Sequence, residues 1–313
     1  MLFVALWVTF VYFPIAHMVW YWDGPDAIAA AALKGTAALD AVNADAGKLF
    51  QWGAIDFAGG TVVHINAGIT GLVMCLLLGK RLGYPNEPMP PHSLTMTMIG
   101  ASLLWVGWFG FNAGSNLEAT SVASVAFMNT MIATAAAGMS WLLTEQIVRG
   151  KPSLLGAASG VVAGLVAVTP ASGFAGTMGS VILGLMVSPI CFFFVSVVKS
   201  KFKYDDSLDV FGVHCIGGIT GALMTAILAN PALGGQGIAD YASKPGTLVV
   251  APYDWVHQLI TQGWAVGLTL VWSGVGAAIL YVIIDKLWGF RVSEEVEREG
   301  LDIAEHGERA YHY

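Results

Sequence analysis

Two segments of the chain carry a histidine in nearly the same setting. One reads VVHINAGITG and the other GVHCIGGITG, and when His64 is aligned with His214 the following GITG matches in full. An aspartate stands eight residues before each histidine, Asp56 in the first copy and Asp206 in the second. Imidazole titrates near neutral pH and both donates and accepts hydrogen bonds. The repeat therefore predicts one polar device, suited to handling a proton, that is present twice.

The composition places this device in a membrane. The chain of 313 residues is 56% hydrophobic, has a mean hydropathy of +0.68 and is only 11% charged, whereas soluble domains carry about 25% charged residues. Apolar runs of about 20 residues recur along the chain, which is typical of spanning helices. We therefore expect an all-α polytopic membrane protein. The net charge of -7 does not by itself indicate a partner.

Eight apolar segments are candidates for membrane spans. The first is too long for the apolar part of a signal peptide and lacks both a basic leader and a small-residue cleavage site. The expected spans cover residues 2–20, 56–79, 94–112, 119–143, 154–170, 174–198, 208–229 and 255–284. They form one transmembrane domain, 1–284, which a tail, 285–313, follows.

Lysine and arginine alternate between the loops that join these spans. Most of the fourteen lie in every second loop and in the tail, and the other loops hold only Lys34, Lys48 and Lys244. Because positively charged loops face the cytoplasm, we expect a cytoplasmic C-terminus. The helices that carry His64 and His214 then run in opposite directions, with each histidine near mid-membrane. Inverted copies that meet at the midplane are typical of transporters.

A single histidine in a helix is often only a satisfied packing residue. An ionisable group inside a membrane is rarer and is usually functional, and the duplication favours a functional interpretation further. The glycines of GITG have a simpler explanation, because small residues let helices approach closely. We interpret Gly156, Gly160 and Gly164 in the same way and assign them no chemistry.

The sequence offers no motif for an enzyme, a metal or a nucleic acid. Cys75, Cys191 and Cys215 lie in apolar spans without metal-ligand spacing. The segment RGKPS lacks the upstream glycine of a phosphate-binding loop. There is no HExxH, no nucleophile elbow and no basic DNA-binding face. We therefore expect no enzymatic activity, no cofactor, no metal ion and no nucleic-acid partner.

Aromatic residues gather at the expected outer ends of two spans. Trp20 ends the first span, and Phe111 and Ser115 end the third. Two interpretations stay open, an interfacial aromatic belt and a small-cation site in which ring faces and a hydroxyl oxygen meet the charge. Trp22 and Trp108 are assigned to the belt.

Seven segments together resemble the ammonium transporter family (Amt/Mep/Rh), in particular its bacterial Amt type. They are IAHMVW, DFAGGTVVHINAG, GWFGFNAGS, FMNT, RGKPSLLG, DVFGVH and the tail EEVEREGLDIAEHGERAY. The resemblance runs from Tyr12 to Tyr311 and implies the family's fold with inverted repeats. It also implies a homotrimer in the plasma (inner) membrane with one pore per subunit.

The resemblance further assigns roles to the polar residues. An outer ammonium site falls on Trp20, Phe111 and Ser115, and a hydrophobic pore is lined by a hydrogen-bonded pair, His64 and His214. Asp56 shapes the outer vestibule and Asp206 takes the matching structural place. We expect NH4+ to be recruited, to lose its proton and to cross as NH3, with methylammonium as an analogue. The family also implies a regulatory tail and a trimeric PII-type signal protein at the cytoplasmic face.

Two other function classes stay open, a non-transporting ammonium sensor or assembly subunit and a bis-histidine haem protein of the membrane. The sequence also departs from the family pattern. The loop 21–53 is longer than expected, and the family has eleven spans where eight are expected here. The absent spans would be the first three, including one phenylalanine of the outer gate. We therefore expect that these residues alone neither form a stable trimer nor transport ammonium.

Overall fold

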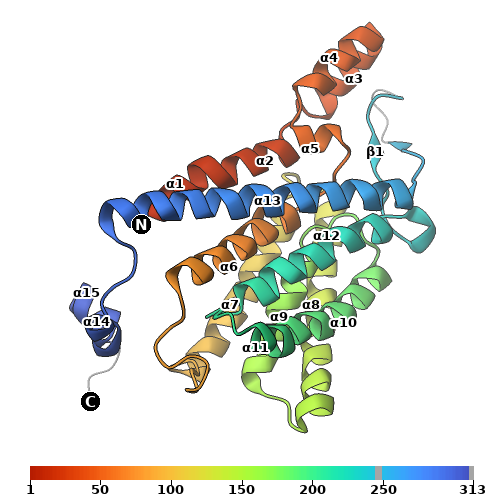
Figure 1. The fold of residues 1–313 in the computed structure, drawn as a ribbon. Coiled ribbons are helices and arrows are strands. Elements are labelled where there is room, and N and C mark those ends of the chain that lie inside the picture. The colour runs from red at the N-terminus through yellow and green to blue at the C-terminus, as the bar shows by residue number, and fades with distance from the viewer. Residues whose placement is uncertain (244–248, 310–313) are drawn as a thin grey trace.

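Helices dominate the computed structural model, which describes residues 1–243 and 249–309 (Figure 1). Its two short strands, β1 (Ala239–Asp240) and β2 (Val249–Val250), pair antiparallel, with Ala239 opposite Val250. They lie beside the start of the longest helix, at the end of the molecule opposite the C-terminal tail. The expected all-α fold is thus confirmed.

Seven helices in the described residues are long and apolar enough to cross a membrane. They are α1–η1–α2 (Leu2–Trp20), η2–α6 (Gly60–Leu78), α7 (Leu94–Gly114), α8 (Ser121–Arg149), α10–η3–α11 (Thr177–Phe202), η4–α12 (Phe211–Leu228) and α13 (Trp255–Trp288). Segment 154–170 contains α9 (Leu154–Val168), which is apolar but shorter than the roughly 20 residues that a span needs.

Four of the long helices change hydrogen-bond pattern along their length. Each contains a π-helical stretch, a feature that is rare and frequent at functional sites. The stretches are η1 (Val8–Tyr12) between α1 (Leu2–Trp7) and α2 (Phe13–Trp20), η2 (Gly60–Ile65) before α6 (Asn66–Leu78), η3 (Phe194–Val198) between α10 (Thr177–Phe193) and α11 (Lys199–Phe202), and η4 (Phe211–Cys215) before α12 (Ile216–Leu228). The two repeated histidines fall in η2 and η4.

The segment between the first two long helices folds as a helical hairpin. The helices α3 (Pro25–Lys34) and α4 (Thr36–Asp45) are rich in alanine, the best helix former. Gly35 joins them at φ 107°, a backbone conformation that favours glycine. The hairpin projects away from the bundle of long helices (Figure 1). The remaining short helices are α5 (Lys48–Gln51), η5 (Pro231–Leu233), α14 (Glu294–Glu299) and α15 (Leu301–His306).

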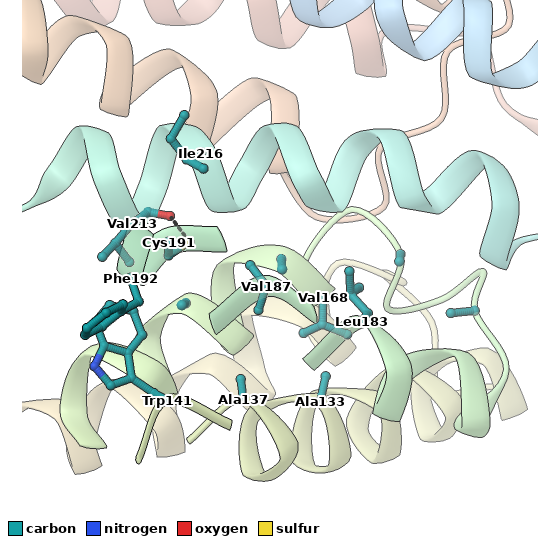
Figure 2. Packing of buried hydrophobic residues seen from close by; sticks show 14 of the residues in the cluster. Ala133, Ala137, Trp141, Val168, Leu183, Val187, Cys191, Phe192, Val213 and Ile216 are labelled. Carbon is teal, nitrogen blue, oxygen red and sulfur yellow. Dashed lines mark hydrogen bonds between the residues drawn. The ribbon is translucent and has the colours of Figure 1, made fainter. Parts of the chain in front are cut away.

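The largest buried cluster lies where α8, α9 and α10 pack together (Figure 2). Ala133 and Ala137 on α8 lie opposite Leu183 and Val187 on α10, and all four are fully buried. On α10, Gly184 leaves no room for a side chain, because an added Cβ would clash with the carbonyl oxygen of Ala133. Small residues let these helices approach until the backbones touch, which is the usual basis of helix association in a membrane.

A proline in α10 frees a carbonyl group that another helix satisfies. Pro189 has no N–H, so it cannot bond the carbonyl of Leu185 one turn earlier. The hydroxyl of Ser140, on α8, donates to that Leu185 oxygen at 2.7 Å. A second hydroxyl, that of Ser188, donates in the other direction to the carbonyl of Ala137 at 2.6 Å. Such side-chain bonds replace the water that is missing from an apolar medium.

We expect the substitution Ser140→Ala to destabilise the bundle, because it leaves the Leu185 carbonyl unpaired. A buried polar group without a partner costs about 1–3 kcal/mol. Thermal unfolding in detergent measures the effect. The matched control is Ser159→Ala, whose hydroxyl bonds only the Leu155 carbonyl of its own helix. Equal melting temperatures for the two variants would contradict the assignment.

Candidate functional site

The two repeated histidines meet in the interior of the bundle. His64 Nδ1 lies 3.3 Å from His214 Nδ1, and the ring centroids are 5.4 Å apart. His64 is 3% exposed and His214 is half-buried. A hydrogen bond between two Nδ1 atoms needs one donor and one acceptor, so the two rings take opposite tautomers when both are neutral. The Nε2 atom of His64 is buried without a partner among the described residues.

Glycines of the repeat bring the two histidines this close. A Cβ added to Gly68 would lie 2.6 Å from the Cβ of Cys215, the residue after His214. A Cβ on the equivalent Gly218 would lie 3.0 Å from Ile65 Cγ1 and 3.2 Å from His64 Cβ. The first glycine of each GITG thus packs against the histidine turn of the other copy. The packing interpretation of GITG is therefore connected directly to the geometry of the pair.

The two aspartates support the starts of the histidine helices. Asp56 Oδ1 accepts hydrogen bonds from the backbone N–H groups of Gly59 and Gly60 at 2.9 and 2.7 Å. Its Oδ2 accepts two more, from Thr61 and Val62, at 2.8 and 3.0 Å. These N–H groups have no partner within the helix, and a carboxylate also suits the positive end of the helix dipole.

Asp206 takes the matching position in the second copy. Its Oδ2 accepts from the Gly212 N–H at 3.1 Å, and its own carbonyl accepts from Lys199 Nζ at 2.7 Å. Both aspartates are buried, at 7% exposed for Asp56 and 2% for Asp206. The sequence spacing between aspartate and histidine therefore reflects a cap followed by about one helical turn.

The three residues of the expected outer site make separate contacts. Trp20 Nε1 donates to the backbone carbonyl of Asp56 at 2.7 Å, which ties the end of α2 to the start of η2. The Phe111 ring lies 6.0 Å from the His64 ring, and Ser115 Oγ donates to the Phe111 carbonyl at 2.7 Å. In the part of the chain that the structure covers, no hydrogen bond or ring contact joins Trp20 to the other two.

The assignment of Trp108 to an interfacial belt was wrong. It is 7% exposed, and its ring stacks on His64 at a centroid distance of 5.2 Å and an interplanar angle of 15°. Its Nε1 donates to Thr169 Oγ1 at 2.9 Å, and its ring also contacts Phe111 at 5.2 Å. The spacing of three residues between Trp108 and Phe111 places both on one helix face. This spacing is the sequence signal that could have placed Trp108 beside the histidine pair.

These rings and imidazoles form a mostly apolar row, in which Trp108 and His64 are buried. Phe111, Trp108 and His64 contact one another, and His214 continues the row. Across residues 1–243 and 249–309, no group of three or more His, Cys, Asp or Glu side chains is arranged to hold a metal ion. The row offers hydrogen bonds and ring faces to a small guest. None of its four side chains carries a carboxylate.

At the other end of the histidine helix, the tail contacts the chain. The Arg291 guanidinium donates to the carbonyls of Leu78 and Lys80 at 2.9 and 2.7 Å. It also pairs with Glu297 of α14 at 2.8 Å, and Glu297 Oε1 accepts from the Leu82 N–H at 2.9 Å. The tail thereby holds the last residues of α6 and the turn that follows.

An ion pair connects that turn to the second histidine helix. Arg81 Nη2 and Nε donate to the two oxygens of Asp205 at 2.7 and 2.9 Å. Burial raises the pKa of Asp205, but the bonds from Arg81 outweigh it and the pKa is lowered overall. Because Asp205 directly precedes Asp206, this bond links the end of one repeat helix to the cap of the other.

We expect Gly68→Ala to destabilise the protein and to separate the two imidazoles. The added methyl group clashes with Cys215, and overpacking of this kind costs about 1–3 kcal/mol. The control is Gly100→Ala in α7, where an added Cβ meets nothing within 4 Å. Alanine is the better helix former by about 1 kcal/mol, so the control keeps or gains stability. Thermal unfolding that shifts equally in both variants would refute the close crossing.

We expect tail docking to depend on the charge of Glu297. The Leu82 N–H and the Arg291 guanidinium lower the pKa of Glu297 below its ordinary value of 4.5. Its stabilising contribution is therefore complete above that value and is lost as the pH falls through the lowered pKa. The distance between spin labels in the tail and α6 should lengthen at acidic pH.

The same distance should lengthen at neutral pH in Glu297→Gln, which removes the charge. The matched control is Glu299→Gln, an exposed residue of the same short helix. A tail that loosens equally in both variants would show that this ion pair does not hold it.

Comparison with known proteins points to one family. The model of the Ammonium Transporter Family matches residues 1–311. The ammonium transporter of Aquifex aeolicus is 43% identical over 310 residues, which cover 99% of this chain and 64% of the relative. The crystal structure of Candida albicans Mep2 aligns with a TM-score of 0.77 at 30% identity, over 98% of this chain and 63% of that one. A structure described as a sensor Amt protein aligns with a TM-score of 0.73 at 29% identity, over 83% and 62%.

Proposed function

The chain belongs to the ammonium transporter family, and we propose that it serves the passage of ammonium nitrogen across a membrane. The observation that carries this proposal is the bonded pair of His64 and His214, which continues the row of rings formed by Phe111 and Trp108. A small guest that moves along this row meets ring faces first and imidazole nitrogens next.

The proposed guest crosses the row as neutral NH3. Moving an ammonium-sized ion from water into a low-dielectric medium costs of order 20 kcal/mol in the idealised limit, whereas a neutral polar group costs about 2–7 kcal/mol. The four side chains of the row include no carboxylate to offset the larger cost, and both oxygens of the nearby Asp56 are engaged by backbone N–H groups. Loss of the proton before entry is therefore part of the proposal.

Recruitment of NH4+ is assigned to Trp20, Phe111 and Ser115. The two rings are 38% and 37% exposed, so they present apolar faces to an approaching cation. The Ser115 hydroxyl donates a hydrogen bond to the Phe111 carbonyl, and its oxygen can still accept a hydrogen bond from ammonium. The bond from Trp20 to the Asp56 carbonyl supports a position next to the cap of η2.

The histidine pair is proposed to receive NH3 and to relay protons. One Nδ1 donates and the other accepts, so the pair can exchange hydrogen bonds with a guest without carrying net charge. Asp56 and Asp206 act through the backbone in this proposal, because their oxygens fix the turns on which the histidines lie.

A non-transporting ammonium sensor is the second candidate. It is favoured by the alignment with the sensor Amt protein, which shares the fold at 29% identity. A sensor needs the recruiting residues but not a path through the histidine pair. The two functions therefore differ in what the loss of the imidazoles does.

Assembly and orientation complete the proposal. We place the protein in the plasma (inner) membrane as a homotrimer, with the tail on the cytoplasmic side, where most lysines and arginines lie. A PII-type signal protein is the proposed partner at that face. Arg291 bonds the Leu78 carbonyl at the end of α6, and Glu297 bonds the Leu82 N–H in the turn that follows. These bonds support a role of the tail in transmitting the effect of partner binding to the histidine helices.

The test is uptake of labelled methylammonium by cells that lack other ammonium transporters and express the protein as its gene encodes it. We expect His64→Ala and His214→Ala to lower uptake by at least about 100-fold, the scale of a positioned proton-transfer group, while the protein stays folded. The matched control is His257→Ala, an exposed histidine at the start of α13. Wild-type uptake in both pair variants would refute the proposed path.

The sensor alternative gives a different result in the same cells. The wild-type protein would then bind methylammonium without taking it up, and the histidine variants would bind it equally well. Binding without uptake therefore favours the second candidate over the first.

A further inference from the structure

A pocket that none of the proposed transport residues lines opens at the end of the molecule that carries α3, α4 and β1 (Figure 1). Its volume is about 400 Å³, and its walls come from three parts of the chain that are far apart in sequence. The lining residues that matter for its chemistry are Trp22, Asn43, Phe50, Phe174, Asp240 and Tyr241. The volume falls within the range of small-molecule sites, about 300–1,000 Å³.

Ring contacts hold the aromatic wall in place. The Trp22 ring stacks on Phe50 at a centroid distance of 5.4 Å and on Tyr241 at 5.7 Å. Phe174 is fixed from behind by Phe57, in an edge-to-face contact at 5.7 Å. These contacts connect Trp22 and Phe50, which flank the hairpin, to Tyr241, the residue after β1, so the wall is formed before a ligand arrives.

The fixed charge on the described lining residues of the pocket is negative. Asp240 is the one charged residue among its described lining residues, which include no lysine, arginine or histidine. Asp240 Oδ1 accepts from the N–H groups of Ala242 and Ser243 at 3.0 Å each. These bonds, with a further one from the Ser243 side chain, lower the pKa of Asp240, so its carboxylate stays ionised at neutral pH.

The surroundings are acidic as well. Burial and then the nearby Glu118 carboxylate raise the pKa of Tyr241. The segment from Tyr21 to Lys48 carries four aspartates against two lysines. They are Asp23, Asp26, Asp40 and Asp45 against Lys34 and Lys48. A negative field of this kind raises the local concentration of cations.

We propose that this pocket binds an organic ammonium cation, of the alkylated type that choline represents. Aromatic faces attract such a cation through the ring quadrupole, and aromatic cages are the usual recognition device for alkylated ammonium groups. Asp240 supplies the opposite charge, and Asn43 offers an amide to a hydroxyl or other polar end of the ligand. The pocket is too large for NH4+ to contact its walls together.

Other ligand classes fit the same walls less well. An anion would meet the Asp240 carboxylate and the negative faces of the rings. A neutral apolar ligand would cover Asp240 and remove its water without replacing it, which costs free energy. A bulky cation satisfies both the rings and the carboxylate. It would also join α4, α5 and β1, which have Asn43, Phe50 and Asp240 in the wall.

The experiment is calorimetric titration of the full chain in lipid nanodiscs with choline and with 3,3-dimethylbutan-1-ol, its neutral carbon isostere. We expect choline to bind at least about tenfold more tightly than the alcohol, because only the cation gains the ring and carboxylate interactions. The readout is binding alone, so it does not depend on the proposed transport.

Two variants locate the site. Asp240→Asn keeps the side-chain oxygen that accepts from Ala242 and Ser243, so the turn is preserved, and choline affinity should fall by about tenfold. Tyr241→Leu removes one ring and should also weaken choline binding. Asp26→Asn, in the first turn of α3 and not among the residues that line the pocket, is the matched control and should bind as the wild type does.

Three results would overturn the proposal. They are equal affinity for choline and the alcohol, an Asp240→Asn variant that binds choline like Asp26→Asn, and the absence of any heat of choline binding at millimolar concentration. Loss of choline binding in Asp240→Asn while His64→Ala binds normally would assign the site to this pocket and not to the transport path.

Discussion

The close crossing of two helices at Gly68 and Gly218 is the contact on which the central site depends. Each glycine lies against the histidine turn of the other repeat, so the backbones of η2–α6 and η4–α12 approach as far as they can. A side chain at either position would push the two helices apart. The Nδ1 atoms of the two histidines, which are 3.3 Å apart, would then be too far from each other to share a hydrogen bond. The polar function of the pair is thus set by residues that have no polar side chain.

The crossing places helix starts in the interior, and this creates a second requirement. The first N–H groups of a helix have no partner within it, and in an apolar medium water does not supply one. Asp56 meets the requirement in one repeat with four hydrogen bonds, and Asp206 does so in the other with a bond to Gly212. The same principle accounts for Ser140, which satisfies the carbonyl that Pro189 leaves free.

Local sequence patterns were enough to predict the helical membrane fold and the duplication of aspartate, histidine and glycine. They were not enough to place Trp108. A tryptophan near the end of an apolar helix looks the same in sequence whether it faces lipid headgroups or a histidine, because the difference lies in the neighbouring helix. The alanines and glycines of the segment 21–53 were visible in the sequence. The position of this segment was not, because it depends on Trp22 stacking on Phe50 and on Tyr241, the residue after β1.

The bond between the two Nδ1 atoms also breaks the symmetry of the repeats at their centre. With both rings neutral, one histidine donates and the other accepts, so the pair has a polarity that the two helices lack. Transfer of the bonded proton alone cannot reverse this polarity, since it would leave an imidazolium beside an imidazolate. Reversal needs a proton to leave one Nε2 and another to reach the opposite Nε2, and the Nε2 of His64 is buried without a partner among the residues that the structure describes. A guest or a water molecule that bonds to this Nε2 would therefore determine which histidine of the pair donates and which accepts.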